Sequence, residues 1–180
     1  MASMYFIAFV LPTGINDEVL KWKLFMNEHF NCFVALRSPA HITLVPPFWM
    51  NDDLEKTLEN SISQFSQHQS SFQINLKNFA AFKPKVIYVD VLLTPSLQTL
   101  HNQLQDYVIA GGLFPIKKDD RPFHPHVTVA TRDLNKKAFY DAWETFKEER
   151  YEASCRFKEI SLLKHDQKKW DVIFTSQFPN

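Results

Sequence analysis

Apolar residues follow two spacings along this chain. Runs rich in aromatic and branched residues are typical of strands, and apolar residues three or four positions apart are typical of amphipathic helices. These patterns predict strands near residues 4–10, 41–47, 72–79, 86–93, 126–129, 151–163 and 170–178, and helices that begin near residues 16, 52, 95 and 135.

Residue types at the predicted helix starts support these boundaries. Asn16 is a suitable N-cap for the first helix, and Glu55 is placed for a contact like that of a capping box if the second helix starts near Asp52. Thr94 followed by Pro95 gives the third helix a cap and a proline at its first position. The expected ends are the proline pair 46–47 for the strand that begins at residue 41, the glycine pair 111–112 for the third helix and residue 149 for the fourth.

Two of the predicted strands carry the same polar pair. They read His41-Ile42-Thr43-Leu44 and His126-Val127-Thr128-Val129. Because side chains alternate between the faces of a strand, each His shares a face with its Thr, and the apolar residues share the opposite face. A structural histidine bonded to backbone and a threonine chosen for the strand would explain one such pair, but two copies in similar surroundings favour a shared site.

The elements around the two pairs are also similar. Each follows a predicted helix and precedes a second helix and two strands, and the second helices start about ten residues after His41 and nine after His126. This indicates an internal duplication of elements. We therefore expect one domain, residues 1–180, made of two pseudo-symmetric halves that bring the two motif strands together across a central groove.

Composition limits the class of protein. The chain has 180 residues, of which 45% are hydrophobic, which is enough for one domain with a packed core. Lys and Arg number 20, equal to Asp and Glu, so the net charge is zero and binding to duplex DNA is not expected. A nucleotide or an RNA end remains compatible with this charge.

The number of cysteines and the first residues of the sequence indicate where in the cell the protein is expected. Two cysteines, Cys32 and Cys155, do not make a disulfide framework, and we expect two buried thiols. The start of the chain reads as a strand rather than a signal peptide, and no apolar stretch is long enough to span a membrane. The expectation is a cytoplasmic protein, a monomer, that does not associate with a membrane.

Two imidazoles and two hydroxyls in one groove suit a phosphodiester. A neutral His can take a proton from water or a ribose hydroxyl while a protonated His gives one to the leaving oxygen. The hydroxyls of Thr43 and Thr128 can donate to the non-bridging oxygens as charge develops. This chemistry requires no metal and no cofactor.

The paired motifs, together with the segments RPFHPHVTVATR and NFAAFKPKVIYVDV, resemble the two-histidine phosphoesterase superfamily. Its bacterial branch comprises 2′-5′ RNA ligase-like proteins and RNA 2′,3′-cyclic phosphodiesterases. The resemblance covers most of the chain and implies an α+β bilobal fold, with two antiparallel sheets, helices on their outer faces and a central cleft.

The resemblance also implies roles for individual residues. His41 and His126 would be the catalytic pair, with His41 favoured as proton donor and His126 as acceptor, and Thr43 and Thr128 would hold phosphate oxygens. The expected reaction opens a 2′,3′-cyclic phosphate to a 2′-phosphate, and reversible 2′-5′ RNA ligase activity is a second activity that the resemblance suggests. Arg132, just after the second motif, is a further candidate for the phosphate, with a solvated surface arginine as the alternative.

Two other functions stay open on the residues. His124 and His126 have a spacing seen in metal sites, so His41, His124 and His126 could form a metal-dependent hydrolase site, with Asp119 and Asp120 close by in sequence. The third class is a non-catalytic nucleotide-binding protein. A chelator separates the first alternative from the metal-free reaction, and binding without turnover would support the second.

The substrate is left open among RNA 3′ ends and small cyclic nucleotides, including 2′-5′-linked oligonucleotides and ADP-ribose 1″,2″-cyclic phosphate. Specificity is expected in residues 46–51 and 111–121, which flank the groove. Core packing is favoured over base stacking for Tyr5, Phe48 and Phe123. Solvated surface is favoured over a cleft rim for Lys83, Lys85, Lys117, Lys118 and Arg121, and no role is expected for His29, His68, His101 or His165.

Overall fold

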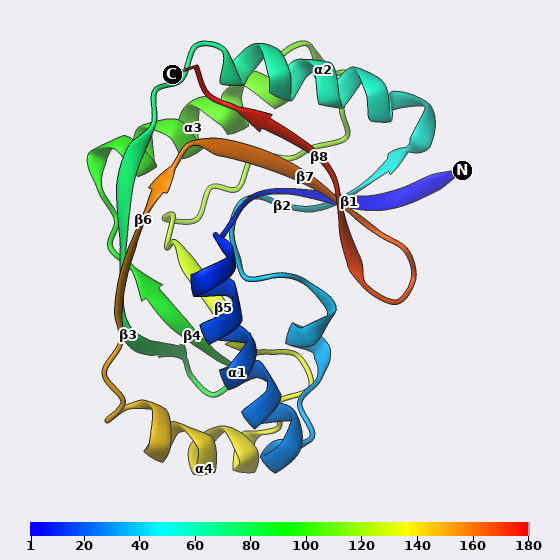
Figure 1. Ribbon diagram of the computed structural model, residues 1–180. Helices are drawn as coiled ribbons and strands as arrows, with labels where there is room; N and C mark the ends of the chain where they lie inside the picture. The colour runs from blue at the N-terminus through cyan, green and yellow to red at the C-terminus, as the bar shows by residue number, and fades with distance from the viewer. Residues whose placement is uncertain (180) are drawn as a thin grey trace.

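Two four-stranded antiparallel sheets form the centre of the computed structural model, which describes residues 1–179 (Figure 1). Sheet A has the order β2 (His41–Asn51), β1 (Ala2–Val10), β7 (Glu159–His165) and β8 (Trp170–Gln177). Sheet B has the order β5 (His126–Ala130), β4 (Val86–Val91), β3 (Phe72–Phe82) and β6 (Glu152–Phe157). The two motif strands, β2 and β5, therefore each lie at an edge of a sheet, and they contact one another.

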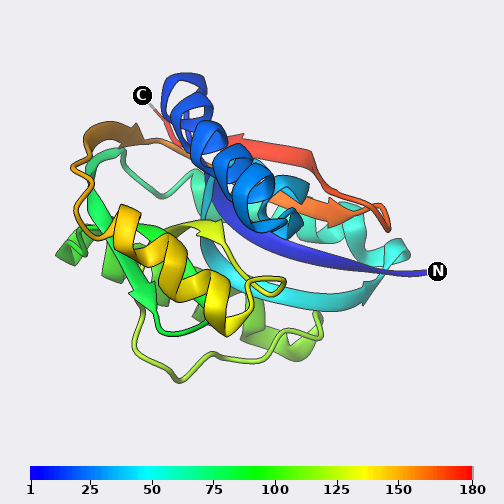
Figure 2. The same ribbon diagram turned by 90° about the horizontal axis from the view of Figure 1, so that it is seen from below.

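Four helices cover the sheets in two pairs. Helices α2 (Glu55–Ser66) and α3 (Pro95–Ile109) pack together over sheet A, and α1 (Thr13–Phe30) and α4 (Lys136–Phe146) pack together beside sheet B (Figures 1 and 2). Helix α1 follows a strand of sheet A but lies against β5, and α3 follows a strand of sheet B but lies against β2. The α+β fold expected from the sequence is thus confirmed. Each sheet is covered in part by a helix that follows, in the chain, a strand of the other sheet. The three short 3-10 helices are η1 (Val34–Arg37), η2 (Asp52–Leu54) and η3 (Ala110–Gly112).

One hydrophobic core joins the two sheets. It contains side chains from β1 and β2 as well as from β3, β4 and β5. Phe157, at the end of β6, stacks on Phe9 of β1 with ring centroids 4.3 Å apart and on Phe72 of β3 at 5.0 Å. Because this contact packs one sheet against the other, the position of β2 relative to β5 is fixed by core packing and not by a flexible linker.

The proline pair in β2 does not end the strand, contrary to the sequence prediction. Strand β2 continues through Pro46 and Pro47 to Asn51. It is the edge strand of sheet A, and its pairing with β1 is irregular between Tyr5 and Ile7, next to the prolines. Proline lacks an N–H and is tolerated at a sheet edge or a bulge, where no ladder hydrogen bond is lost.

The predicted strand 151–163 is two strands in different sheets. β6 ends at Phe157 in sheet B and β7 begins at Glu159 in sheet A, so the chain crosses between sheets at Lys158. The sequence has no glycine or proline at this point to mark the break. Sheet A therefore combines the first and last strands of the chain, and the two sheets do not coincide with the first and second halves of the sequence.

Two of the predicted helix starts were wrong and two are confirmed. Helix α1 begins at Thr13, and the Asn16 side chain accepts a hydrogen bond from the Ala40 N–H instead of capping the helix. Helix α2 begins after the 3-10 turn η2, and Glu55 accepts hydrogen bonds from Tyr5 and Lys164. Thr94 and Asn135 do cap α3 and α4 with their side chains.

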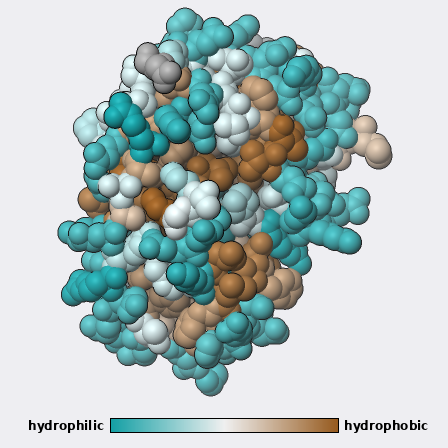
Figure 3. Space-filling model, in the orientation of Figure 1, coloured by the Kyte–Doolittle hydropathy of each residue, from teal (hydrophilic) through white to brown (hydrophobic). Residues whose placement is uncertain are grey.

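The two cysteines, both expected to be buried, differ in exposure. Cys32 is buried as predicted, but Cys155 is only half-buried. Within residues 1–179, no helix combines the length and the apolar character needed to cross a membrane. Figure 3 shows hydrophobic residues gathered mainly across the middle of one face, with hydrophilic residues around them.

Candidate active site

His41 and His126 are held by the same local device. The Nδ1 atom of His41 lies 2.7 Å from the Pro39 carbonyl oxygen, and the Nδ1 atom of His126 lies 2.7 Å from the His124 carbonyl oxygen. A carbonyl can only accept, so each Nδ1 carries the hydrogen and donates it. Each neutral ring then has Nε2 as the nitrogen that can accept a proton.

The alternation of side chains along both motif strands is as the sequence predicted. His41, Thr43, His126 and Thr128 are half-buried. The intervening apolar residues are fully buried, with 0% exposure for Ile42, Leu44 and Val127 and 1% for Val129. The apolar face of each strand thus belongs to the core, and the polar face is left for the space between the sheets.

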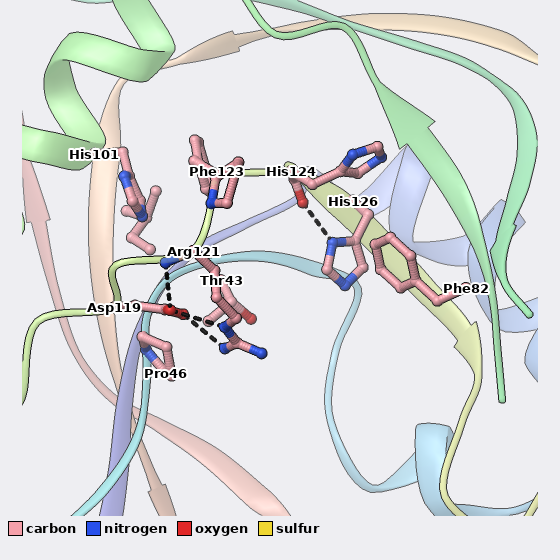
Figure 4. A pocket seen from close by; sticks show the side chains of 11 residues that line it. Thr43, Pro46, Phe82, His101, Asp119, Arg121, Phe123, His124 and His126 are labelled. Carbon is pink, nitrogen blue, oxygen red and sulfur yellow. Dashed lines mark hydrogen bonds and ion pairs between the residues drawn. The ribbon is translucent and has the colours of Figure 1, made fainter.

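Two adjoining cavities receive these polar side chains. One, of about 430 Å³, is lined by His126 and Thr43, and Figure 4 shows Thr43 between His126 and Asp119. The other, of about 210 Å³, is lined by His41, Thr43, Thr128 and Arg132. Because Thr43 lines both cavities, they are neighbours. The structure therefore brings together all five residues that the sequence singled out.

Aromatic rings stand beside each imidazole. The Phe6 ring lies 4.8 Å from the His41 ring, centroid to centroid, and also contacts Trp170 at 4.6 Å. Phe82 and Tyr88 lie 5.2 Å and 5.0 Å from the His126 ring. Sequence reasoning missed these rings because the signal is the pairing of strands, such as Thr128 opposite Tyr88, and not any spacing within one strand.

Burial and nearby charges lower the pKa of both histidines. Burial, together with the positive charge of Lys23 and the proximity of His126, lowers the pKa of His41 to about 4, against the effect of the hydrogen bond to Pro39. Burial also lowers the pKa of His126, where the carboxylate of Asp90 acts in the opposite direction. The two imidazoles therefore lie in different electrostatic surroundings despite their similar geometry.

His101 has partners, contrary to the sequence expectation. Its ring stacks on Phe123 with centroids 3.7 Å apart and planes 9° apart, and Gln105 lies 2.7 Å from its Nε2. His101 and Phe123 line the larger cavity opposite His126 (Figure 4). Phe123 is thus a wall of the site, whereas Tyr5 and Phe48 are buried in the core.

The basic residues expected at the solvated surface divide between the cavities and the surface. Arg121 lines the larger cavity and is paired with Asp119, 2.7 Å from its carboxylate (Figure 4). Lys117 and Lys118 line a further cavity that shares Arg121 and Asp119 with the first. The Lys83 ammonium instead lies 5.7 Å from the centre of the Trp143 ring.

Within residues 1–179, the structure shows no cluster of ligands for the alternative metal site at His41, His124 and His126. His124 faces Tyr88 and Asp90, with its Nε2 3.1 Å from the tyrosine hydroxyl and 3.3 Å from the carboxylate. Nowhere in residues 1–179 do three His, Cys, Asp or Glu side chains come together as metal ligands. The geometry of His41, His124 and His126 is thus not that of a three-ligand centre.

The two antiparallel sheets, with helices packed against them, agree with the fold that the resemblance to the two-histidine phosphoesterases implied. The sequence places the chain in that class directly. The model of the 2′-5′ RNA ligase superfamily matches residues 12–169, and the chain belongs to this superfamily.

Individual relatives are similar at modest identity. The chain is 28% identical over 134 residues to an RNA 2′,3′-cyclic phosphodiesterase of Bacillus subtilis, covering 71% of this chain and 70% of the relative. It is 26% identical over 145 residues to a Geobacillus kaustophilus protein that is named as a phosphoesterase. This match covers 79% of this chain and 77% of the relative. The structure of Escherichia coli LigT complexed with 3′-AMP matches all of both chains with a TM-score of 0.69 at 18% identity, which shows the shared fold.

Proposed function

We propose that the protein is a metal-independent phosphodiesterase that opens 2′,3′-cyclic phosphates at RNA or nucleotide ends and leaves a 2′-phosphate. With the 5′-hydroxyl of a second RNA end in place of water, the same attack on phosphorus and the same departure of the 3′-oxygen would form a 2′-5′ linkage. The observation that carries the proposal is the matched pair of imidazoles. Both rings are fixed through Nδ1 to a carbonyl two residues earlier, and both line adjoining cavities with the two threonines.

The reaction uses these groups in named roles. A water oxygen attacks phosphorus and loses its proton to the neutral histidine, while the bond from phosphorus to the ribose 3′-oxygen breaks. The other histidine, protonated, gives its proton to that leaving oxygen. The hydroxyls of Thr43 and Thr128 donate to the non-bridging oxygens, where negative charge develops in the transition state.

The charges around the two rings differ. Lys23 opposes protonation of His41, whereas at His126 the charge of His124 opposes protonation and that of Asp90 favours it. We keep the order that the family resemblance implies, with His41 as the proton donor and His126 as the acceptor in ring opening.

The larger cavity suits a nucleoside. It adjoins His126 on one side and offers the faces of Phe123 and Pro46 with the polar side chain of Arg121 on the other. Aromatic and apolar walls with a few polar groups are usual in sites that hold a base. The B. subtilis relative is named for RNA 2′,3′-cyclic phosphate, and the LigT structure contains 3′-AMP, which supports a nucleotide substrate here.

The purified protein is expected to hydrolyse nucleoside 2′,3′-cyclic phosphates in excess EDTA, because the proposed site uses imidazole and hydroxyl groups alone. Phosphorus NMR of the product should show the 2′-monoester. Loss of activity in EDTA with recovery in zinc would replace this proposal by a metal-dependent site. Nucleotide binding without turnover would replace it by a binding protein.

The pH dependence of kcat/KM is expected to be bell-shaped, with both limbs on the acid side of pH 6.5, the ordinary pKa of histidine. The rate falls at low pH, where both rings are protonated and neither can accept a proton, and at higher pH, where both are neutral and neither can donate one. The pKa of His41 is lowered to about 4 and that of His126 is lowered too, which places both limbs on the acid side. A bound phosphate anion favours both protonated rings, so the bell for kcat should lie at higher pH than that for kcat/KM. Initial rates from below pH 4 to pH 9 test this, and a profile without limbs would remove the acid–base assignment.

A further inference from the structure

Trp49 of β2 is a large apolar side chain on the surface. It is 61% exposed, whereas its neighbours Phe48 and Met50, on the other face of the strand, are buried in the core. The other three tryptophans of the chain are half-buried, and each contacts an aromatic ring. A single exposed apolar side chain is common, so the surroundings of Trp49 decide whether it belongs to a site.

Trp49 lines a cavity of about 420 Å³ whose walls come from two segments. These are residues 46–49 of β2 and residues between 115 and 121, and we call the cavity the outer groove. Pro46, Asp119 and Arg121 line both the outer groove and the larger cavity that contains His126, so the two adjoin. Figure 4 shows Pro46 and Asp119 on the side of the larger cavity away from His126. The outer groove therefore extends the proposed active site in the direction away from the reacting groups.

The outer groove carries a positive charge. Lys117, Lys118 and Arg121 line it, and Asp119 is the one acidic residue in its walls. Asp119 is paired with Arg121 at 2.7 Å, and Lys118 is paired with Asp106 at 2.6 Å. Among the ion pairs within residues 1–179, none includes Lys117, which leaves its ammonium for an anion. Cations together with an exposed aromatic ring are the usual means of binding single-stranded nucleic acid, because the cations bind phosphate and the ring stacks on a base.

We propose that the outer groove binds the nucleotide that precedes the cyclic end of an RNA strand, an inference that rests on the proposed phosphodiesterase function. The terminal nucleoside occupies the larger cavity. Its ribose 5′-oxygen carries the phosphate that joins it to the preceding nucleotide, and Lys117 binds this phosphate. The base of the preceding nucleotide stacks on Trp49. The volume of about 420 Å³ lies within the usual range for one small ligand, such as one nucleotide.

Another protein molecule fits the outer groove less well than RNA does. A stable interface between proteins buries about 800 Å² on each partner, and charged residues are depleted at its centre. The outer groove instead places three basic side chains around one tryptophan. An RNA strand supplies the complementary charge, and its end would already occupy the adjoining cavity.

Three substrates of increasing length test the proposal: uridine 2′,3′-cyclic phosphate, the same compound with a 5′-phosphate, and a diuridylate with the same cyclic end. Trp49→Ala is expected to lower kcat/KM on the order of 10-fold for the diuridylate alone, the usual loss when a base loses its stacking partner. Lys117→Gln should lower kcat/KM for both substrates that carry the added phosphate. It should also reduce the slope of log kcat/KM against log salt by about 0.7, the value for one contact to a single strand. Neither change should affect the uridine compound, since neither residue lines the two cavities of the site.

Control variants separate stacking and charge from general effects. Trp49→Phe keeps an aromatic face and should recover most of the rate on the diuridylate. Tyr140→Ala and Lys136→Gln change an exposed aromatic residue and an exposed lysine of α4, outside these cavities, and should leave all three rates unchanged. Because the Trp49 side chain is mainly in solvent, its replacement should leave the thermal unfolding temperature close to that of the native protein.

The deciding quantity is the ratio of kcat/KM for the diuridylate to that for the uridine compound. A ratio that falls in Trp49→Ala and recovers in Trp49→Phe supports the proposal. An unchanged ratio overturns it, and a native dimer that Trp49→Ala converts to monomers at an unchanged ratio would assign the groove to contact between copies. If the native protein hydrolyses none of the three substrates, the proposed function fails. Quenching of tryptophan fluorescence by diuridylate 2′-phosphate then tests the groove: loss of quenching in Trp49→Ala supports the site, and equal or absent quenching overturns it.

Discussion

His41→Ala and His126→Ala are each expected to lower kcat/KM by on the order of 10²–10⁴, the usual contribution of a general acid or base. Each ring is fixed through Nδ1, and the two rings line adjoining cavities that share Thr43. Loss of either ring leaves one proton transfer to water. Initial rates on a nucleoside 2′,3′-cyclic phosphate in EDTA give the measurement.

The double variant should lose less than the product of the two single losses, because the two groups act on one transition state. His29→Ala is the matched control, since His29 is an exposed histidine whose Nδ1 lies 3.0 Å from the Phe25 carbonyl oxygen and it does not line either cavity of the site. Its rate should equal that of the native protein. Full activity in both site variants would mean that the paired motifs are structural.

Thr43→Val and Thr128→Val are expected to lower kcat by on the order of 10²–10³ each, the usual effect of removing one donor to a developing oxyanion. Valine keeps the branched shape of threonine and its preference for strands, so the change removes a hydroxyl and little else. Because Thr43 lines both cavities and Thr128 only the smaller, their effects on KM are expected to differ, with Thr43→Val the larger.

Thr→Ser at the same positions restores the hydroxyl and should recover most of the rate. Thermal unfolding should change little in the valine variants, since the polar face of each strand lines the cavities and the core contains the opposite face. Equal activity in the valine and serine variants would show that these hydroxyls do not touch the phosphate.

The sequence predicted the parts of this site that depend on spacing within one strand. The alternation in His41–Leu44 and His126–Val129 is visible in the order of residues, and so is the burial that follows from it. The caps at Thr94 and Asn135 could be predicted for the same reason, because a cap contacts backbone two or three residues away.

What the sequence did not predict depends on contacts between distant segments. Asn16 was expected to cap its own helix but instead binds Ala40, and the buried Lys23 donates a hydrogen bond to the Ser38 carbonyl oxygen. The prolines of β2 looked like a strand end because the edge position that tolerates them is a property of the sheet. The crossing at Lys158 has no local signal at all, since a packed Phe157 fits a continuous strand equally well.

The composition of sheet A has a consequence for synthesis on the ribosome. Sheet B is complete once residue 157 has emerged, but β1 pairs with β7, and β7 with β8, so sheet A requires the chain through residue 177. Pairing of such distant segments is slow, and a strand without its neighbour is prone to associate wrongly. Strand β1, made early and paired with the first motif strand β2, therefore has no neighbour on its other side until β7 is made. A nascent or truncated chain that ends before β7 would display β1 as an open edge, and such edges are prone to pair with other chains.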